Sequence, residues 1–449
     1  MSDNNRPAQH NGPPDWAAHL IIYELNPRTF APPHGAGNGH GSGTFRTLTA
    51  RIPYLADLGV NCIWLAGYCA ATDHFYGIWS VYATIRPDSF DPELGTDRDF
   101  KTLIETCHSH DIKVILDVIS HGVVEESSLI TEHPTWFSGR SWNMIDYDYS
   151  NNEFREWWVQ LWVDYVLRYG IDGFRVDISL QDHTLWDLIC ARAADSGHPV
   201  VVMPENGRYH FGQRDTVGFS CDVAADWRAD YLPISTVQVS CHDNGWLSPP
   251  GNYYSVRGRR SLFGYSALLS YRVPVFFAGE EFDAGTHPLP RLTRGLYGAG
   301  GPGGWLYGSI VDPGEVQEDW VKAAMLKDVH RMIMIRRNNS DIINANHLDG
   351  NMYALECHPK LPFVPYIRVS ESGSAIVVIA NEADETRRLE IEIPFEKIGS
   401  SKGRYQIRDL WGEKEEIVVK GHSSYRLNVE LPADRRPGGG LAVYRIDPC

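Results

Sequence analysis

The sequence lacks any run of about 18 apolar residues, the length that a membrane-spanning helix needs. Its first ten residues, Met-Ser-Asp-Asn-Asn-Arg-Pro-Ala-Gln-His, are polar and do not follow the charged-then-apolar pattern of a secretory signal. We therefore expect a cytoplasmic protein that does not associate with a membrane.

Positive charge is also scarce. Lys and Arg total 41 against 57 Asp and Glu, which gives a formal net charge of −16. Nucleic acids and anionic membrane surfaces are bound mainly through Lys and Arg, so neither is an expected partner. The eight cysteines are scattered without a CxxC pair. In a cytosolic chain of 449 residues this pattern indicates small buried side chains rather than a disulfide framework.

Apolar and aromatic residues are plentiful. Hydrophobic residues make up 43% of the chain and charged residues 22%, the balance of a folded globular protein. Aromatic residues reach 12%, with 14 Trp, 22 Tyr and 16 Phe. Flat amphipathic rings suit hydroxylated ligands such as sugars, and a large aromatic core explains the same abundance equally well.

Short apolar runs alternate with stretches of helical period from Leu20 onward, after a polar arm at residues 1–18. The runs predicted as strands are Leu20–Glu24, Cys62–Leu65, Val114–Val118, Gly173–Val176, Val200–Met203, Val223–Ala225, Val237–Ser240 and Val273–Phe277. The predicted helices are Leu48–Leu58, Phe100–His110, Phe154–Tyr169, Leu185–Ala194, Ser261–Tyr271 and Val316–Arg337. Eight such units over residues 19–348 predict a (β/α)8 TIM barrel, with a doubly wound open sheet as the alternative.

The last hundred residues have a different texture. Segments such as Ala375–Ala380, Leu389–Ile393, Arg404–Ile407, Ile417–Val419 and Ala442–Ile446 are β-rich, with turn residues between them. Residues 349–449 are therefore predicted to form an antiparallel β-sandwich domain.

Two glycine-rich loops follow the first and eighth predicted strands, at residues 34–43 and 295–304. The second contains Gly298-x-Gly300-x-x-Gly303, a formal dinucleotide pattern. Pro302 interrupts it and no helix opens after it, so a nicotinamide cofactor is not expected. The loops are interpreted as substrate-covering segments or as plain surface loops.

Carboxylates recur where the predicted strands end, which is the catalytic edge of a barrel. Each one taken singly could be a solvated loop acid, but together they suit glycosidic bond cleavage by two carboxyl groups. Asp177 follows Arg175 on the same strand face, so a cation is expected to keep it ionised as a nucleophile requires. Glu205 has no adjacent cation in sequence and follows an apolar strand, which favours a protonated acid. The strand-end acids and their neighbours are Asp117, Asp177, Glu205, Asp243, Glu280 and Glu281.

Four segments together resemble the α-amylase family of glycoside hydrolases. They are Ile22–Phe30, Tyr54–Leu65, Gly173-Phe-Arg-Val-Asp177 and Pro274–Glu281. The resemblance extends from about residue 20 to the C-terminus. It implies Asp177 as nucleophile, Glu205 as general acid/base and Asp243 as transition-state stabiliser.

The resemblance also implies sugar-binding residues. Arg175 would orient the nucleophile, His242 and His121 would bind sugar hydroxyls, and Tyr76 lies near the position of a tyrosine that stacks on the sugar.

The sequence departs from the family pattern at several places. Ser120-His121 replaces an Asn-His pair whose Asn is often a calcium ligand in the family. We therefore expect no cofactor, with a bound calcium ion as the open alternative. Ser179-Leu180-Gln181 replaces a Lys-His pair that often contacts the acceptor sugars. The insert at about 122–150 is short and is predicted to be a loop. Its Trp136, Phe137 and Trp142 are either sugar platforms or packing residues.

The expected function is cleavage of α-1,4 or α-1,6 links in short linear or cyclic malto-oligosaccharides, like that of a cyclomaltodextrinase or neopullulanase. A transglycosylase of the same family is the alternative, and a non-catalytic glycan-binding relative is a remote one. The expected partner is the oligosaccharide substrate, and a homo-oligomer is left open.

Overall fold

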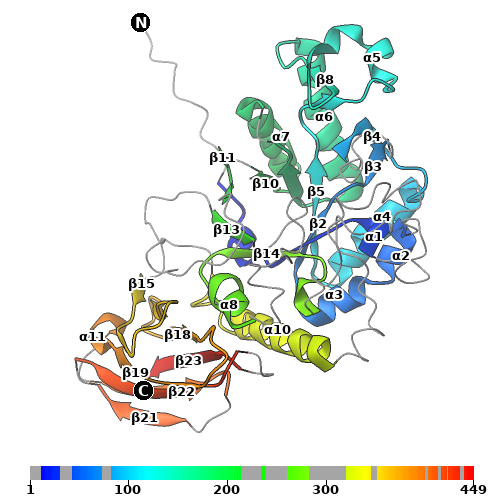
Figure 1. Ribbon diagram of the computed structural model, residues 1–449. Coiled ribbons are helices and arrows are strands. Elements are labelled where there is room, and N and C mark those ends of the chain that lie inside the picture. The colour runs from blue at the N-terminus through cyan, green and yellow to red at the C-terminus, as the bar shows by residue number, and fades with distance from the viewer. Residues whose placement is uncertain are drawn as a thin grey trace, which may run out of the picture. The chain divides into compact units, whose positions relative to one another are not determined.

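The computed structural model describes residues 12–30, 43–72, 82–178, 181–205, 207–213, 234–238, 260–282, 320–344, 351–399, 403–412, 416–421, 423–434 and 439–449. Its internal contacts divide the chain into two compact units. One comprises residues 1–215 and 289–311, and the other residues 216–288 and 312–449. Figure 1 labels the helices and strands of both.

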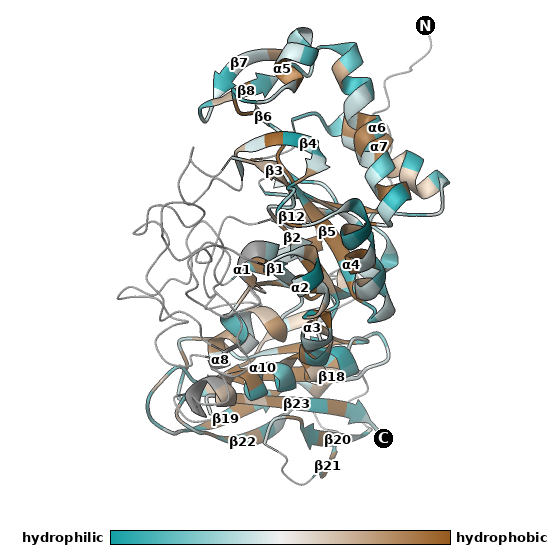
Figure 2. Cartoon of the chain, turned by 90° about the vertical axis from the view of Figure 1, so that its right-hand side faces the viewer, coloured by the Kyte–Doolittle hydropathy of each residue, from teal (hydrophilic) through white to brown (hydrophobic). Residues whose placement is uncertain are grey.

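Five parallel strands form the centre of the first unit, in the order β10-β9-β5-β2-β1. Nearly all of their residues are buried, and β2 and β5 are largely brown in Figure 2. Near-continuous burial is what parallel strands covered on both faces require. The strands are β1 (Ile22–Leu25), β2 (Cys62–Leu65), β5 (Lys113–Val118), β9 (Gly173–Val176) and β10 (Val201–Pro204).

Helices connect these strands, and local sequence marks their ends. Thr96 and Asp99 form a capping box at the start of α4, and Asn151 accepts a hydrogen bond from the Phe154 amide at the start of α6. The single helix predicted at Leu48–Leu58 is interrupted at residues 50–51. The helical elements of this unit's N-terminal half are η1 (Asp15–His19), α1 (Pro27–Phe30), α2 (Phe45–Thr49), α3 (Ile52–Leu58) and α4 (Asp97–Ser109). Those that follow are α5 (Leu129–Glu132), η3 (Pro134–Trp136), α6 (Asn152–Tyr169) and α7 (His183–Asp195).

The segment at about 122–150 is more ordered than the predicted loop. It contains the antiparallel sheet β6-β8-β7 together with α5 and η3. Its strands are too short, at two to five residues, for alternation to reveal them. Short antiparallel elements of this unit are β3 (Cys69–Ala71) with β4 (Thr84–Phe90), β6 (Gly122–Val123), β7 (Phe137–Ser141) and β8 (Met144–Tyr147), and β11 (Gly207–Arg208) with β12 (Phe211–Gln213).

The second unit contains the parallel pair β13 (Ile234–Gln238) and β14 (Val273–Phe277). The helix predicted at Ser261–Tyr271 is α8 (Arg260–Phe263) followed by a π-helical turn at Gly264–Leu268. Next come η5 (Glu280–Phe282) and α10 (Trp320–Asn338). The predicted sixth strand, Val223–Ala225, lies outside the described residues.

Residues 351–449 form the predicted β-sandwich, with its apolar core between two antiparallel sheets. One sheet has the order β15-β17-β18-β23-β20-β21 and the other β16-β19-β22. The strands are β15 (Asn351–Ala354), β16 (Cys357–His358), β17 (Tyr366–Val369), β18 (Ala375–Ala380), β19 (Arg387–Ile393), β20 (Arg404–Asp409), β21 (Ile417–Lys420), β22 (Tyr425–Leu431) and β23 (Leu441–Pro448), with the short helix α11 (Phe395–Ile398).

Hydrogen bonds join this sandwich to the rest of its unit. Tyr366 donates its hydroxyl to the backbone carbonyl of Tyr265 at 3.0 Å, and Tyr265 donates to the carbonyl of Val364 at 2.6 Å. The guanidinium of Arg445 donates to Asn339 at 2.8 Å. The sandwich and the helices that precede it therefore form one packed body. No helix among the described residues has both the length and the apolarity to cross a bilayer.

Candidate active site

Arg175 on β9 is the centre of the candidate site. Its side chain is 1% exposed, and its guanidinium carbon lies 4.9 Å from the centre of the Trp64 ring. Its Nη1 lies 3.0 Å from Asp117 Oδ1 and 2.6 Å from Asp177 Oδ1, and its Nη2 lies 3.3 Å from Glu205 Oε2. One guanidinium thus contacts three carboxylates, a planar geometry to which arginine is suited.

Strand pairing explains how these side chains meet. Asp117 pairs with Arg175 across β5 and β9, and Arg175 pairs with Met203 across β9 and β10, two residues before Glu205. The close approach of β9 and β10 depends on Gly173, where a Cβ would lie 2.4 Å from the carbonyl oxygen of Val201. Glycine at the start of this motif lets neighbouring backbones approach.

Asp117 is completely buried, and both of its carboxylate oxygens have partners. Its Oδ2 accepts hydrogen bonds from the Trp64 indole at 3.0 Å and the Tyr82 hydroxyl at 3.1 Å, while Oδ1 faces Arg175. A buried carboxylate with a cation and two donors is a compensated charge. Its arrangement fixes the position of the Arg175 guanidinium.

Asp177 and Glu205 are the predicted pair that the structure brings together. They stand at the ends of the neighbouring strands β9 and β10 and contact adjacent nitrogens of the same guanidinium. The amide of Ile178 donates to Glu205 Oε2. Ile178 has φ of 67°, in the left-handed region that a β-branched residue rarely occupies. In this conformation the Ile178 amide points at Glu205.

The electrostatics of Asp177 differ from the sequence expectation. Arg175 lowers its pKa as predicted, but burial has the larger effect and, with Asp117 and Glu205 nearby, raises the pKa to about 7. Glu205 in turn has a cation beside it that its own sequence neighbours did not reveal, because Arg175 reaches it from the next strand. The two carboxyl groups share one electrostatic environment.

His121 lies at the edge of this group. Its Nδ1 is 3.7 Å from Asp177 Oδ2 and has no hydrogen-bond partner, and its Nε2 is 3.1 Å from the sulfur of Met144. Burial lowers its pKa to about 4, which keeps the imidazole neutral at pH 7. A thioether only accepts, so the proton is assigned to Nε2 and Nδ1 is an acceptor directed toward the site.

Three predicted site residues, Asp243, His242 and Tyr76, lie outside the described residues, as do residues 34–42 and 295–304 of the glycine-rich loops. Ser120, which stands in place of the calcium-binding Asn, donates its hydroxyl to the Asp177 carbonyl at 3.0 Å. Within the described ranges no three His, Cys, Asp or Glu side chains form a metal-binding group.

Sequence reasoning placed Asp117 at a strand end but gave it no role, and it missed Trp64 and Tyr82. An acid within the apolar run Val114–Val118 was the available signal, because a buried charge requires partners. Nothing in the sequence pointed to Trp64 or Tyr82, since both meet Asp117 through pairing of distant segments.

The remaining aromatic candidates divide by exposure. Trp136 is 3% exposed and stacks on His133 with ring centres 3.7 Å apart, and Phe137 is half-buried, whereas Trp142 is 67% exposed. The helical spacing of Trp157, Trp158 and Trp162 predicts three core residues; Trp158 and Trp162 are buried, whereas Trp157 is only half-buried.

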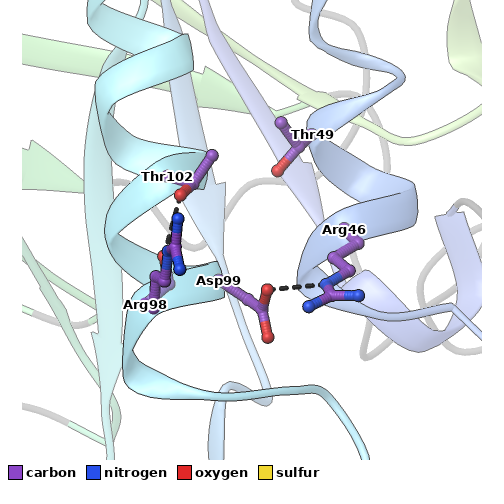
Figure 3. Close-up of a pocket in the computed structure, with 5 residues that line it drawn as sticks. All are labelled: Arg46, Thr49, Arg98, Asp99 and Thr102. Atoms are coloured by element: carbon purple, nitrogen blue, oxygen red, sulfur yellow. Dashed lines mark hydrogen bonds and ion pairs between the residues drawn. The ribbon is translucent and has the colours of Figure 1, made fainter.

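A surface pocket of about 400 Å³ lies elsewhere in this unit, on α2 and α4 (Figure 3). It is lined by Arg46, Thr49, Arg98, Asp99 and Thr102. Asp99 is already paired with Arg46 at 2.7 Å, and it is the one carboxylate among the described lining residues. Those residues do not supply the pair of carboxyl groups that glycosidic cleavage uses.

Two family models and several known proteins match parts of this chain. Residues 25–135 match the model of the alpha amylase catalytic domain, and residues 366–434 match that of the alpha galactosidase C-terminal beta sandwich domain. An alpha-glucosidase of Culex pipiens is 34% identical over 107 residues, which are 23% of this chain and 17% of that protein. A 4-alpha-glucanotransferase of Thermotoga neapolitana is 27% identical over 197 residues, and the match covers 35% of this chain and 42% of that protein. An oligo-1,6-glucosidase of Parageobacillus thermoglucosidasius is 35% identical over 124 residues, which are 27% of this chain and 19% of that protein.

The matched region thus spans less than half of each of these relatives. Solved structures match over almost the whole chain at lower identity. A maltogenic alpha-amylase from Thermotoga neapolitana has a TM-score of 0.67 at 17% identity, covering 95% of this chain and 98% of its own. A debranching enzyme from Nostoc punctiforme has a TM-score of 0.66 at 15% identity, and the match covers 96% of this chain and 99% of that protein. The predicted barrel with a C-terminal β-sandwich and the predicted resemblance to the α-amylase family are both confirmed.

Proposed function

We propose that this relative of the α-amylase family is a retaining α-glucosidic enzyme, which cleaves α-1,4 or α-1,6 links of short linear or cyclic malto-oligosaccharides. The observation that carries the proposal is the contact of Asp177 and Glu205 with one buried guanidinium. Two carboxyl groups on neighbouring strand ends are the arrangement that double-displacement glycoside cleavage needs. The names of the matched relatives, glucosidases and a glucanotransferase among them, support an α-glucan as substrate.

In the first step, ionised Asp177 attacks the anomeric carbon while Glu205 gives its proton to the leaving glycosidic oxygen. The carbon–oxygen bond breaks and a glycosyl ester forms on Asp177. Glu205 then takes a proton from water, whose oxygen attacks the same carbon and releases Asp177. Two inversions at one carbon retain the α configuration.

Arg175 and its surroundings set the geometry of these steps. Arg175 holds the Asp177 oxygen at 2.6 Å and is itself held by Asp117, so the nucleophile is positioned before substrate arrives. The Ile178 amide and Arg175 both contact Glu205 Oε2. The unpartnered Nδ1 of His121 can accept a hydrogen bond from a sugar hydroxyl next to the reacting carbon.

Transfer to a sugar hydroxyl is the second candidate. It shares the covalent intermediate and differs only in the acceptor that resolves it. The specific observation in its favour is the match to a 4-alpha-glucanotransferase, which extends over 197 residues. High acceptor concentration distinguishes the two, because a transferase then forms longer oligosaccharides instead of glucose and maltose.

The first test is hydrolysis of maltotriose, panose, pullulan and a cyclic maltodextrin by the wild type and by Asp177→Asn. The change removes the nucleophile and keeps the shape of the side chain, so turnover should fall about a thousandfold or more while maltotriose still binds. Asp195→Asn, an exposed acid at the end of α7, is the matched control and should retain full activity. Undiminished turnover by Asp177→Asn would assign the nucleophile elsewhere, and absence of turnover by the wild type on every α-glucan would favour a non-catalytic glycan-binding protein.

A further inference from the structure

Trp142 has an unusual position in the described part of the chain. It is the most exposed of the large apolar side chains there, at 67%. It stands with Asn143 between the paired residues Ser141 and Met144, at the two-residue turn of the β7–β8 hairpin. Most of its apolar ring therefore faces water, so covering the ring with an apolar surface would be favourable.

The backbone at this turn is a second, independent observation. Trp142 has φ of 51° and Asn143 of 59°, as a type I′ turn requires at both central positions. Asn, Asp and Gly adopt this conformation readily, whereas a bulky residue does so at a cost. Trp142 therefore has an unfavourable conformation as well as an unfavourable exposure, and such local costs gather at functional sites.

The hairpin connects this side chain to the catalytic groups. Met144, two residues after Trp142, contacts His121, and His121 lies 3.7 Å from Asp177. Consecutive Cα atoms are 3.8 Å apart, so the Cα of Trp142 is at most about 7.6 Å from that of Met144. A short series of contacts therefore links the turn that bears Trp142 to Asp177 within one unit.

The base of the hairpin is rigid. Tyr147 at the end of β8 is buried and stacks on Phe154, with ring centres 4.8 Å apart. A Cβ on Gly122, which pairs with Asp146, would lie 2.1 Å from the carbonyl oxygen of Ile145, so β6 and β8 are tightly apposed. A rigidly carried indole presents its ring without a large loss of conformational entropy on binding.

We propose that Trp142 is a stacking platform for a glucosyl unit remote from the scissile bond, and that it sets the preference for longer oligosaccharides. The inference rests on the proposed function. The apolar face of a pyranose ring covers the indole while its hydroxyls remain in water, which matches an amphipathic ring at the surface. Binding energy from such a remote unit is available to the reaction only when the substrate is long enough to reach it.

The test compares kcat/KM for maltoheptaose with that for maltotriose in wild type and Trp142→Asn. Asparagine suits the left-handed backbone, so the hairpin should be kept and Tm should not fall. We expect the maltoheptaose value to fall about tenfold and the maltotriose value to change less than twofold. Trp142→Phe should recover part of the loss. Asn143→Gly, which keeps the ring and suits the same turn, should leave the ratio of the two values unchanged.

Binding without turnover gives the second readout. Calorimetric titration of maltoheptaose into Asp177→Asn, with and without Trp142→Asn, should show weaker binding in the double variant and little difference for maltotriose. If the ratio of kcat/KM for maltoheptaose to that for maltotriose is equal in wild type and Trp142→Asn, Trp142 is not a stacking platform, while the proposed function stands. A wild type inactive on both oligosaccharides would instead refute the proposed function.

Discussion

At the scale of single residues, the buried charges around Arg175 are the most informative feature. Asp117 and Arg175 are almost completely withdrawn from water, and Asp177 is buried beside them. Desolvating such groups costs free energy that an apolar cluster of similar volume would not, so stability alone does not account for them. Under the proposed function, their arrangement holds one carboxylate in place for reaction.

In the proposed mechanism, Asp117 acts on the reaction through its neighbours, as a positioning residue. Its negative charge raises the pKa of Asp177, and the pKa of that carboxyl is about 7. The free enzyme should therefore lose kcat/KM as pH falls through about 7, because Asp177 must be ionised to attack. Asp117→Asn removes the charge, so the acid limb should move to lower pH. The measurement is kcat/KM on maltotriose from pH 4 to 9.

The same variant should also be less stable. Arg175 loses one buried partner, and the free energy of unfolding should fall by about 3 kcal/mol in chemical denaturation. Asp195→Asn, on the exposed end of α7, should alter neither the pH profile nor the stability. An acid limb that stays in place in Asp117→Asn would show that Asp177 does not control it.

Sequence could identify some of these residues and not others. Arg175 and Asp177 share a strand face two residues apart, and that spacing is visible in the sequence. The contacts of Arg175 with Asp117 and Glu205 are not visible in the sequence, because they depend on which strands are neighbours and in which register they pair. The raised pKa of Asp177 could not be predicted either, since burial rather than the adjacent arginine dominates it.

At the scale of elements, long periodic segments were predictable and short irregular ones were not. The bounds of β2, β9, β14 and β18 agree with the predicted runs. The β6-β8-β7 sheet, with strands of two to five residues, was predicted as a loop because alternation cannot show over so few positions. The helix at Leu48–Leu58 was predicted as continuous because its apolar spacing runs on across residues 50–51. The structure starts a new helix at Ile52, with Pro53 in its first turn.

Gly173 shows how an element positions the site. A methyl group there would meet the carbonyl oxygen of Val201 at 2.4 Å, with backbone rather than a flexible side chain in the way. Gly173→Ala should push β10 from β9, lower the free energy of unfolding by roughly 2–3 kcal/mol, and reduce kcat by moving Glu205. Denaturation and maltotriose kinetics measure both effects.

Gly197 provides the matched control. It has φ of 82° and nothing within 4 Å of a Cβ, so Gly197→Ala should cost only about 1 kcal/mol of conformational strain. Its kcat should equal that of the wild type. A Gly173→Ala protein with wild-type stability and activity would contradict the assignment of Gly173 to the approach of β9 and β10.

At the scale of the whole molecule, periodicity predicted the barrel and the sandwich but left a doubly wound open sheet as an alternative to the barrel. Alternation of buried strands and helices indicated the barrel, and the change of texture near residue 349 indicated the sandwich. The division of the chain into two units could not be predicted, because it depends on contacts such as those of Tyr366 with Tyr265. Those contacts join segments about a hundred residues apart.

The central claim is that Asp177 and Glu205 act together on one anomeric carbon. Proton NMR of the products during the first minutes of maltotriose or cyclic maltodextrin cleavage tests it most directly, before mutarotation mixes the anomers. The account predicts that the α anomer forms first, because two displacements at the same carbon retain its configuration. Initial formation of the β anomer would show a single displacement by water and would contradict the covalent role of Asp177.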